Sequence, residues 1–237
     1  MSIPFIAFFY IHIPMSSPYN APIEVRRLEN ILRDFTYQNG FDIGNVFDDL
    51  LTFIIHGWSP SAPPLKKWSY TNDQTAVFYN MYREWVTIMD KQTISKSWYD
   101  AFGDLFMATV VSSSGQKYKG QFFTPPHICD LMSAIISGTK HPKTKILDPT
   151  CGSGRLLLAH HALYPQDILV GKDISITCCM MTVCNFLVHA CDSLVICCNA
   201  LDPSSFIRGW RINERLSFTG TPCIREITGT EYFQHYK

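Results

Sequence analysis

The sequence predicts an α/β protein, with a doubly wound parallel sheet preceded by an all-helical segment. Residues 23–111 show apolar side chains at helical spacing. From residue 143 onward, short apolar runs alternate with helical stripes, a pattern typical of a parallel sheet. The polar stretch "SSSGQKYKG" at residues 112–120 separates the two patterns. We therefore expect a helical N-terminal domain at residues 15–111 and a second domain at residues 117–237.

The helical segment is expected to contain four helices, each with an apolar stripe. The stripes are Leu28, Ile31, Leu32 and Phe35; Phe47, Leu50, Leu51, Ile54 and Ile55; Phe78, Met81, Tyr82, Trp85 and Met89; and Phe102, Leu105 and Phe106. Gly40 and Gly57 end the first two helices, and the Pro-rich residues 59–67 form a connector. Asn72 or Asp73 is expected to cap the third helix. Large apolar side chains at this spacing indicate a packed core rather than a cofactor site.

The second domain is expected to begin with a helix at Pro126 that ends at Gly138. Its stripe is Ile128, Leu131, Met132, Ile135 and Ile136. Strands are then expected at residues 145–147, 168–171 and 193–198, with helices at 155–162 and 176–190 between them. In the last part of the chain, "RLSF" and "CIREI" are expected to form short strands.

One short loop, within "ILDPTCGSGRLLL" at residues 146–158, is the strongest indication of a ligand site. Asp148 is expected at the carboxyl end of a buried strand, at the edge where open α/β sheets bind ligands. Gly152 and Gly154 have no Cβ, so the backbone can turn sharply and approach a ligand closely. Asp173 lies about 20 residues further on, where an acid accepts hydrogen bonds from ribose hydroxyls. The loop therefore predicts a nucleoside with a small attached group.

The details of the loop favour one kind of nucleoside. A dehydrogenase fingerprint needs a third glycine where this chain has Leu157, and the lysine that ends a P-loop is missing. Asp148 disfavours a pyrophosphate and favours a ligand with a cationic group. S-adenosylmethionine, with its ammonium and sulfonium groups, fits that condition. The alternative from the residues themselves is a tight strand–helix turn that binds nothing.

Composition limits the class of protein. The chain has 237 residues, 46% hydrophobic and 17% charged, which is enough apolar material for a core. The apolar residues 1–14 lack the flanks of a secretory signal and are left out of the fold prediction, because translation could begin at Met15. No apolar stretch reaches the ~18 residues of a membrane helix. Nine cysteines form no CxxC pair, so we expect no zinc site and a reduced, cytoplasmic protein. A net charge of zero makes binding to DNA without a partner unexpected.

Three motifs, in this order, resemble the N6-adenine DNA methyltransferases, and in particular the modification subunit of type I restriction–modification systems. They are "GQFFTPPHICDLM" at residues 120–132, "ILDPTCGSGRLLL" at 146–158 and "GKDI" at 171–174. The resemblance covers residues 117–202 well and the helical segment loosely. It implies a Rossmann-like methyltransferase fold and S-adenosylmethionine as cofactor. It also implies DNA as a partner reached through a complex, and a specificity subunit or complementing methyltransferase subunit.

The resemblance implies a set of cofactor-binding residues and no metal. By position in the family's motifs, Phe122, Phe123, Thr124 and Pro125 line the methionine end; Asp148, Cys151, Gly152 and Gly154 form the loop beneath it; Asp173 holds the ribose hydroxyls; Ile174 packs on the adenine; and Asn199 and Leu201 lie near the adenine amino group. Cys198 stands where glycine is usual in the family. For Asn199, an ordinary turn is an equal alternative, because asparagine favours turns.

The family's transfer motif, Asn/Asp-Pro-Pro-Tyr/Phe after the fourth strand, does not occur in the sequence. In the family this motif holds the target amine and stacks on the flipped base. The similar "LDPS" at residues 201–204 directly follows the third strand, so no catalytic residue is assigned. Without a fourth strand beside it, the strand at 145–147 is expected to have an open apolar edge. Three outcomes remain open: the tail covers that edge, a second polypeptide completes the sheet, or the chain is a truncated or decayed copy.

Two functions therefore follow from the sequence. The first is the S-adenosylmethionine-binding part of a site-specific adenine-N6 DNA methyltransferase, active only when the missing motif is supplied. The second is a non-catalytic interaction protein or decayed methyltransferase-like protein, suggested by exposed-looking aromatic residues in the helical segment. A weaker third hypothesis places an unrecognised active site for another methyl acceptor at the terminal aromatics Tyr232, Phe233 and Tyr236.

Overall fold

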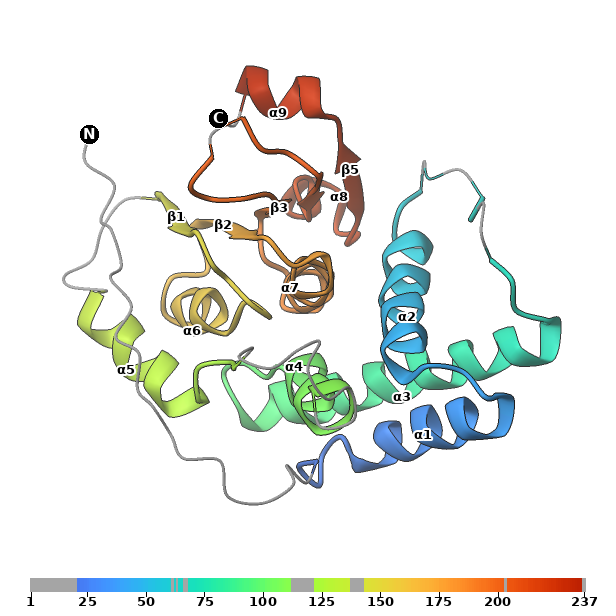
Figure 1. Ribbon diagram of the computed structural model, residues 1–237. Helices are drawn as coiled ribbons and strands as arrows, with labels where there is room; N and C mark the ends of the chain where they lie inside the picture. Colours follow the sequence, from blue (N-terminus) through green and yellow to red (C-terminus); the bar gives the residue numbers. More distant parts are fainter. Residues whose placement is uncertain are drawn as a thin grey trace.

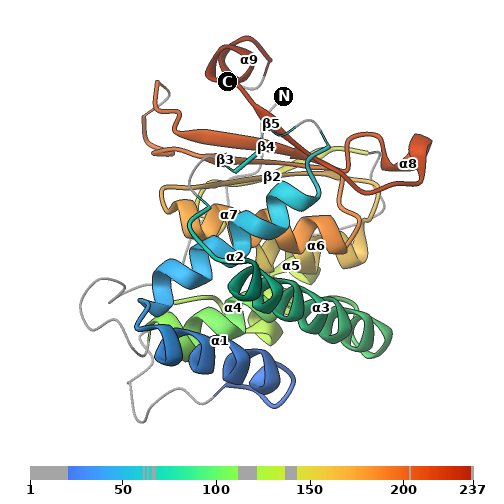
Figure 2. The same cartoon turned by 90° about the vertical axis from the view of Figure 1, so that its right-hand side faces the viewer.

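The structure is a computed structural model that describes residues 21–111 except 61, 63, 66 and 67, and residues 122–136, 143–202 and 204–235. These residues form a mixed α/β protein with a five-stranded sheet and helices on both of its faces (Figure 1). Seen from the side, the layers are the C-terminal helix, the sheet, a layer of helices beneath it, and the remaining N-terminal helices furthest away (Figure 2). None of the described helices is long and apolar enough to cross a membrane.

The sheet contains three parallel strands followed by two antiparallel ones. The strands are β1 (Lys145–Asp148), β2 (Ile168–Asp173), β3 (Ser193–Cys197), β4 (Arg208–Ile212) and β5 (Ile224–Ile227), and they lie in this order across the sheet. β1, β2 and β3 confirm the three predicted parallel strands. The strand order follows the chain without the reversal that defines a doubly wound sheet, so that detail of the predicted fold is not confirmed in the described residues.

Two helices cover one face of the sheet, and a short helix lies on the other (Figures 1 and 2). α6 (Arg155–Leu163) and α7 (Ile176–Val188) connect consecutive parallel strands and lie together on the lower face in Figure 1. α9 (Gly229–His235) lies on the opposite face. All five residues of β3 are buried, because this strand has a neighbour on each side and helices on both faces.

The N-terminal segment contains the predicted four helices. They are α1 (Arg26–Asn39), α2 (Ile43–Gly57), α3 (Asn72–Ser95) and α4 (Ala101–Phe106), and α4 continues into a π-helical turn, η1 (Met107–Val111). Gly40 ends α1 in the left-handed conformation, with φ 66°, as the sequence predicts. The predicted cap of α3 was wrong by one residue. Thr71 caps this helix, because its hydroxyl accepts a hydrogen bond from the Gln74 backbone N–H while the Gln74 side chain accepts one from the Thr71 N–H.

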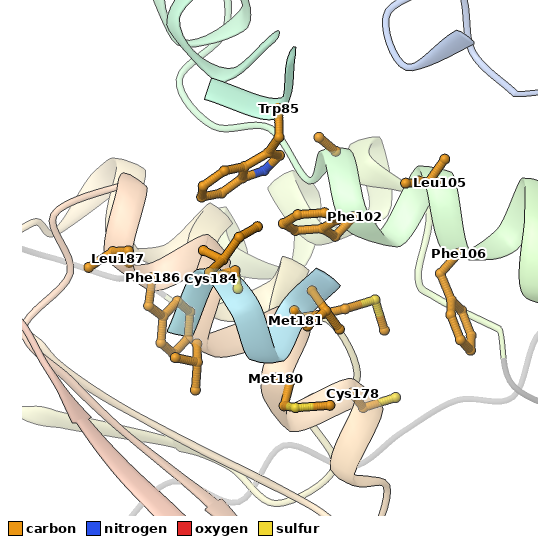
Figure 3. Close-up of a cluster of buried hydrophobic side chains, with 14 of the residues drawn as sticks. Trp85, Phe102, Leu105, Phe106, Cys178, Met180, Met181, Cys184, Phe186 and Leu187 are labelled. Carbon is orange, nitrogen blue, oxygen red and sulfur yellow. The ribbon is translucent and has the colours of Figure 1, made fainter. Parts of the chain in front are cut away.

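The N-terminal helices and the sheet region share one continuous hydrophobic core. α2 packs against α7, and Figure 3 shows Trp85 and Phe102 facing the sulfur-rich face of α7, with Met181 and Cys184. Trp85 and Phe102 stack with ring centroids 5.0 Å apart. Trp85 and Phe102 are buried, which confirms the predicted core, whereas Tyr37 and Tyr79 of the same segment are 90% and 58% exposed. The burial of the large aromatic side chains Trp85 and Phe102 against α7 holds the helices in place relative to the glycine loop.

The last part of the chain differs from its prediction. "CIREI" contributes β5 as expected, but "RLSF" contributes to the short helix α8 (Leu216–Thr219), and β4 forms from the preceding "RGWRI". The β4–β5 hairpin extends the sheet beyond β3 and does not cover β1. The possibility that the tail covers the open edge is therefore wrong for residues 204–235. Trp210 and Ile212 are fully buried, so the hairpin is held by the same core.

The helix α5 (Pro126–Ile136) leaves apolar side chains exposed. β1 pairs with β2, and its other side has no strand partner among the described residues. The predicted stripe of α5 is largely exposed, with Leu131 at 55% and Ile135 at 72% of their accessible surface. α5 buries Cys129 and Ser133 instead, through its packing on α6. The helix is confirmed, and its predicted end at Gly138 lies outside the described residues.

Candidate cofactor-binding site

The glycine loop joins β1 to α6 at the carboxyl edge of the parallel strands. Gly152 and Gly154 have φ values of 57° and 88°, which side chains with a Cβ rarely adopt. A Cβ on Gly152 would lie 3.0 Å from the Phe123 ring, and one on Gly154 would lie 3.0 Å from the Thr182 methyl carbon. Glycine is therefore favoured at both positions for two reasons: φ is positive, and a Cβ would have too little space.

Asp173, at the end of β2, is the residue predicted to bind the ribose hydroxyls. In the structure its carboxylate is hydrogen-bonded to the glycine loop. Its Oδ2 accepts a hydrogen bond from the Gly152 backbone N–H at 2.9 Å, and its Oδ1 accepts one from the Ser175 N–H at 2.8 Å. Burial raises the pKa of this carboxyl above its usual value, and these backbone donors oppose the rise. Ile174 follows with 68% of its surface exposed. The structure thus gives a carboxylate fixed against the loop beside an exposed apolar side chain.

Asp148, at the end of β1, is 2% exposed and lies on the other side of the loop. Its Oδ1 accepts a hydrogen bond from the Thr150 N–H at 3.0 Å, and its Oδ2 has no hydrogen-bond partner among the described residues. Burial raises its pKa from 3.8 to about 6, helped by the nearby Asp173 and opposed by the Thr150 hydrogen bond. A buried carboxyl in this state gains from a cationic ligand, because the ligand replaces the lost hydration of the charged form.

A buried polar cluster ties the loop to the helical segment. Asp100 caps α4 and is 2% exposed. It accepts four hydrogen bonds, from Gly103 N at 2.7 Å, Asn185 Nδ2 at 2.8 Å, Ser153 Oγ at 2.5 Å and Arg155 Nε at 2.6 Å. Arg155 also donates to Asp104 at 2.7 Å. Burial opposes the charge of Arg155, but the two aspartates prevail and raise its pKa.

A small hollow of about 60 Å³ brings several of the predicted residues together. It is lined by Phe122, Phe123, Thr124, Asp148, Thr150, Cys151, Gly152, Ser153, Arg155 and Leu156. Six of the predicted site residues are in this set. The volume is below the ~300–1,000 Å³ of typical ligand sites, so the hollow encloses one end of a ligand at most. Its residues fit the methionine end of S-adenosylmethionine, since a buried carboxyl and the glycine loop both line the same small space.

Other predicted residues do not line this hollow. Pro125 begins α5 by accepting hydrogen bonds from the Ile128 and Cys129 N–H groups. Asn199 uses its side-chain oxygen to accept the Leu201 N–H at 3.1 Å, which is a turn contact. Leu201 is 93% exposed. The described geometry therefore gives Asn199 the turn role that the sequence left open, and it gives Leu201 no packing partner.

A larger cavity of about 420 Å³ lies elsewhere, between α2 and the β4–β5 hairpin. Arg208 and Arg225, two of the arginines that line it, are paired with glutamates: Arg208 with Glu226, and Arg225 with Glu214 and Glu231. We assign the site to the smaller hollow because it lies on the glycine loop and the strand ends. Within the described ranges, no group of three or more His, Cys, Asp and Glu side chains is placed to hold a metal ion.

Three buried residues of the site were missed by the sequence reasoning: Asp100, Ser153 and Arg155. Asp100 is more than fifty residues from Arg155 in the chain, and its local pattern indicates no more than a helix cap. Arg155, next to Gly154, was treated as the start of a helix. Cys151 was correctly placed in the loop, but its thiol contacts the Thr182 hydroxyl at 3.6 Å, in the interior beneath the loop.

This fold and site define an α/β protein with a glycine loop that lies between two strand-end carboxylates. Residues 97–204 match the family model described as "N-6 DNA Methylase". This region, just under half of the chain, is therefore similar to the N6-adenine DNA methyltransferase family. The match includes α4, the glycine loop and all three parallel strands, so the Asp100–Arg155 cluster lies within the family region.

Two curated relatives are methylase subunits of type I restriction enzymes. The MpnII methylase subunit of Mycoplasma pneumoniae is 36% identical over 75 residues, which is 31% of this chain and 14% of that protein. The MjaVIII methylase subunit of Methanocaldococcus jannaschii is 27% identical over 151 residues, which is 61% of this chain and 24% of that protein. The matched part of this chain thus spans about a quarter or less of each relative. No solved structure matches the chain significantly.

Proposed function

We propose that this chain is the S-adenosylmethionine-binding part of an adenine-specific N6 DNA methyltransferase of restriction–modification type. The observation that carries the proposal is the hollow on the glycine loop, which is lined by Asp148 and by residues 122–124. The cofactor would supply the methyl group from its sulfonium. In this chain, Asp148 would hold the ammonium group, Asp173 the ribose hydroxyls and Ile174 one face of the adenine.

Methyl transfer to DNA needs more than these residues. The relatives named above are subunits of restriction enzymes, which supports DNA as the substrate reached through a complex. The sequence has no Asn/Asp-Pro-Pro-Tyr/Phe motif to hold a flipped adenine. We therefore expect this chain to bind the cofactor and to methylate adenine in DNA when another polypeptide segment brings that motif to the site.

Calorimetric titration of the purified chain with S-adenosylmethionine tests the proposal. We expect saturable binding with one site per chain. Asp173→Asn removes the charge that would bind the ribose and should weaken binding about tenfold or more, as expected for a lost hydrogen bond to a charged group. Asp202→Asn, in an exposed turn, is the matched control and should bind as the wild type does. Well-folded protein that shows no binding at all contradicts the proposal.

A non-catalytic interaction role, the second function suggested by the sequence, has different support in the structure. The unpaired side of β1 and the exposed Leu131 and Ile135 support it. An open strand edge beside an apolar helix face is a common route to association. A complementing methyltransferase subunit that adds a parallel strand to β1 is the partner that suits this surface.

This association can be tested without a known partner, because an uncovered surface of this kind promotes self-association. Light scattering of the wild type should show concentration-dependent association, and the double variant Leu131→Lys with Ile135→Lys should be monomeric. The free energy of unfolding should stay within about 0.5 kcal/mol, because both side chains are exposed. A wild type that stays monomeric at high concentration contradicts this part of the proposal.

A further inference from the structure

The cavity of about 420 Å³ between α2 and the β4–β5 hairpin has no part in the proposed function. Its volume lies within the ~300–1,000 Å³ of small-molecule sites. Among the described residues, it shares no lining side chain with the hollow on the glycine loop. Binding of a ligand here would therefore not depend on cofactor binding.

Two sets of hydrogen bonds fix the hairpin relative to the helices that form the opposite wall. At the start of β5, the Ile224 backbone N–H donates to the carbonyl oxygen of Trp58, which directly follows α2, at 2.8 Å. Directly after β4, the buried Asn213 side chain donates to the carbonyl oxygens of Phe186 and Leu187 in α7, at 3.1 Å each. The walls of the cavity are therefore positioned by the fold itself, as in most small-molecule sites.

The inner part of the cavity is apolar. Its most buried lining side chains each have 5% or less of their surface exposed: Ile55 of α2, Met180 of α7, and Trp210 and Ile224 of the hairpin. Thr52 adds a hydroxyl, but this group donates to the Met180 sulfur at 3.7 Å. Because a methionine sulfur makes favourable contacts with aromatic rings, this space suits a flat, apolar ring system.

Three of the four arginines that line the cavity have a close carboxylate partner among the described residues. The pairs are Arg208–Glu226 at 2.7 Å, Arg211–Asp192 at 2.9 Å and Arg225–Glu231 at 2.9 Å. Glu214 also lines the cavity, and it lies 3.6 Å from Arg211 and 3.4 Å from Arg225. Its charge is therefore shared by two arginines that are already paired.

The fourth arginine, Arg215, differs from the others. It is exposed, and its side chain has no hydrogen bond or ion pair in the part of the chain that the structure describes. Its backbone carbonyl accepts the Thr219 N–H at 2.8 Å, so α8 holds the residue at the cavity. The lining thus offers one guanidinium without a carboxylate partner, at the solvent side of an apolar space.

We propose that this cavity binds a small aromatic carboxylate. The ring system packs against Ile55, Met180 and Ile224, and the carboxylate stays at the solvent side. There Arg215 donates hydrogen bonds to the carboxylate, because the fork of a guanidinium matches the two carboxylate oxygens. A neutral ring compound lacks this contact, and a cationic one is repelled by Arg215.

Calorimetric titration of the whole chain with 2-naphthoate and with its neutral amide, 2-naphthamide, tests this assignment. The two probes share one ring system, so the difference in affinity reports the carboxylate. We expect one saturable site per chain and an affinity for 2-naphthoate about three- to tenfold higher, since the ion pair lies at the solvent side. Folded protein that does not bind 2-naphthoate overturns the proposal. Equal affinities overturn it as well, because the cavity would then select apolar groups without regard to charge.

Two variants place the binding in this cavity. Arg215→Gln should lower the affinity for 2-naphthoate to that for 2-naphthamide, whereas Arg83→Gln, at an exposed position of α3, is the matched control and should keep the wild-type ratio. Thr52→Phe fills the cavity with a ring and should abolish the binding of both probes. If Thr52→Phe is folded by circular dichroism and binds both probes as the wild type does, they occupy another surface and the assignment is wrong. The Arg215 comparison stands even if Thr52→Phe does not fold.

Discussion

Replacing Asp148 by asparagine should stabilise the protein at neutral pH, although this residue is central to the proposed site. The folded state raises the pKa of Asp148 from 3.8 to about 6, mainly by burial. Between pH 3.8 and about pH 6, the folded state binds more protons at Asp148 than the unfolded state does. The free energy of unfolding therefore falls as the pH rises through this range. Above about pH 6 the full cost of a buried charge is present.

The size of this cost follows from the shift. About two pKa units at ~1.4 kcal/mol each give roughly 3 kcal/mol as an upper estimate. Asparagine has nearly the same shape and keeps an oxygen for the Thr150 N–H, but it carries no charge. We therefore expect Asp148→Asn to be more stable than the wild type by about 1–3 kcal/mol at pH 7.5, and by little at pH 4, where Asp148 is neutral in the folded protein.

Urea unfolding of both proteins at the two pH values provides the assay. The quantity to compare is the difference in the free energy of unfolding between variant and wild type. Burial also raises the pKa of Asp173 and Asp104, but these groups contribute equally in both proteins. Asp34→Asn, on the exposed face of α1, is the control and should change little at either pH. An Asp148→Asn protein that is no more stable than the wild type at pH 7.5 would refute the reasoning.

Three further predictions concern the same region. Asp100→Ala leaves the donors that meet at Asp100 without their acceptor, so urea unfolding should show a loss of about 3–5 kcal/mol; a loss below 1 kcal/mol would contradict the central role of this residue. Gly154→Ala adds a Cβ at positive φ against Thr182, and it should cost more stability than Gly220→Ala, where φ is also positive but nothing lies within 4 Å; equal costs would show that packing is unimportant. Binding of S-adenosylmethionine should weaken by up to about tenfold per pH unit below pH 6, as Asp148 becomes protonated, and calorimetry that shows constant affinity from pH 5 to 7 would remove Asp148 from ammonium binding.

Much of the fold could be read from local patterns. The helices with one apolar stripe and the strands of the parallel half depend on periodicity over a few residues, and their positions were predicted to within a few residues. The glycine loop was also predictable, because Gly152 and Gly154 mark positive φ values in a strand–helix turn. The hairpin was less predictable, since "RGWRI" has charged residues at both faces and becomes a strand through pairing with β3.

The sequence by itself determined the helical segment, the three parallel strands, the loop between Asp148 and Arg155, and the family that residues 97–204 resemble. The tertiary structure alone decided that Asp100 meets Arg155, that the tail extends β3 rather than covering β1, and that the stripe of α5 stays exposed. The physical reason is the separation along the chain over which each kind of interaction acts. Helix and turn preferences act between neighbours in the chain, whereas a buried ion pair or a strand pairing depends on groups that come together only when the core packs.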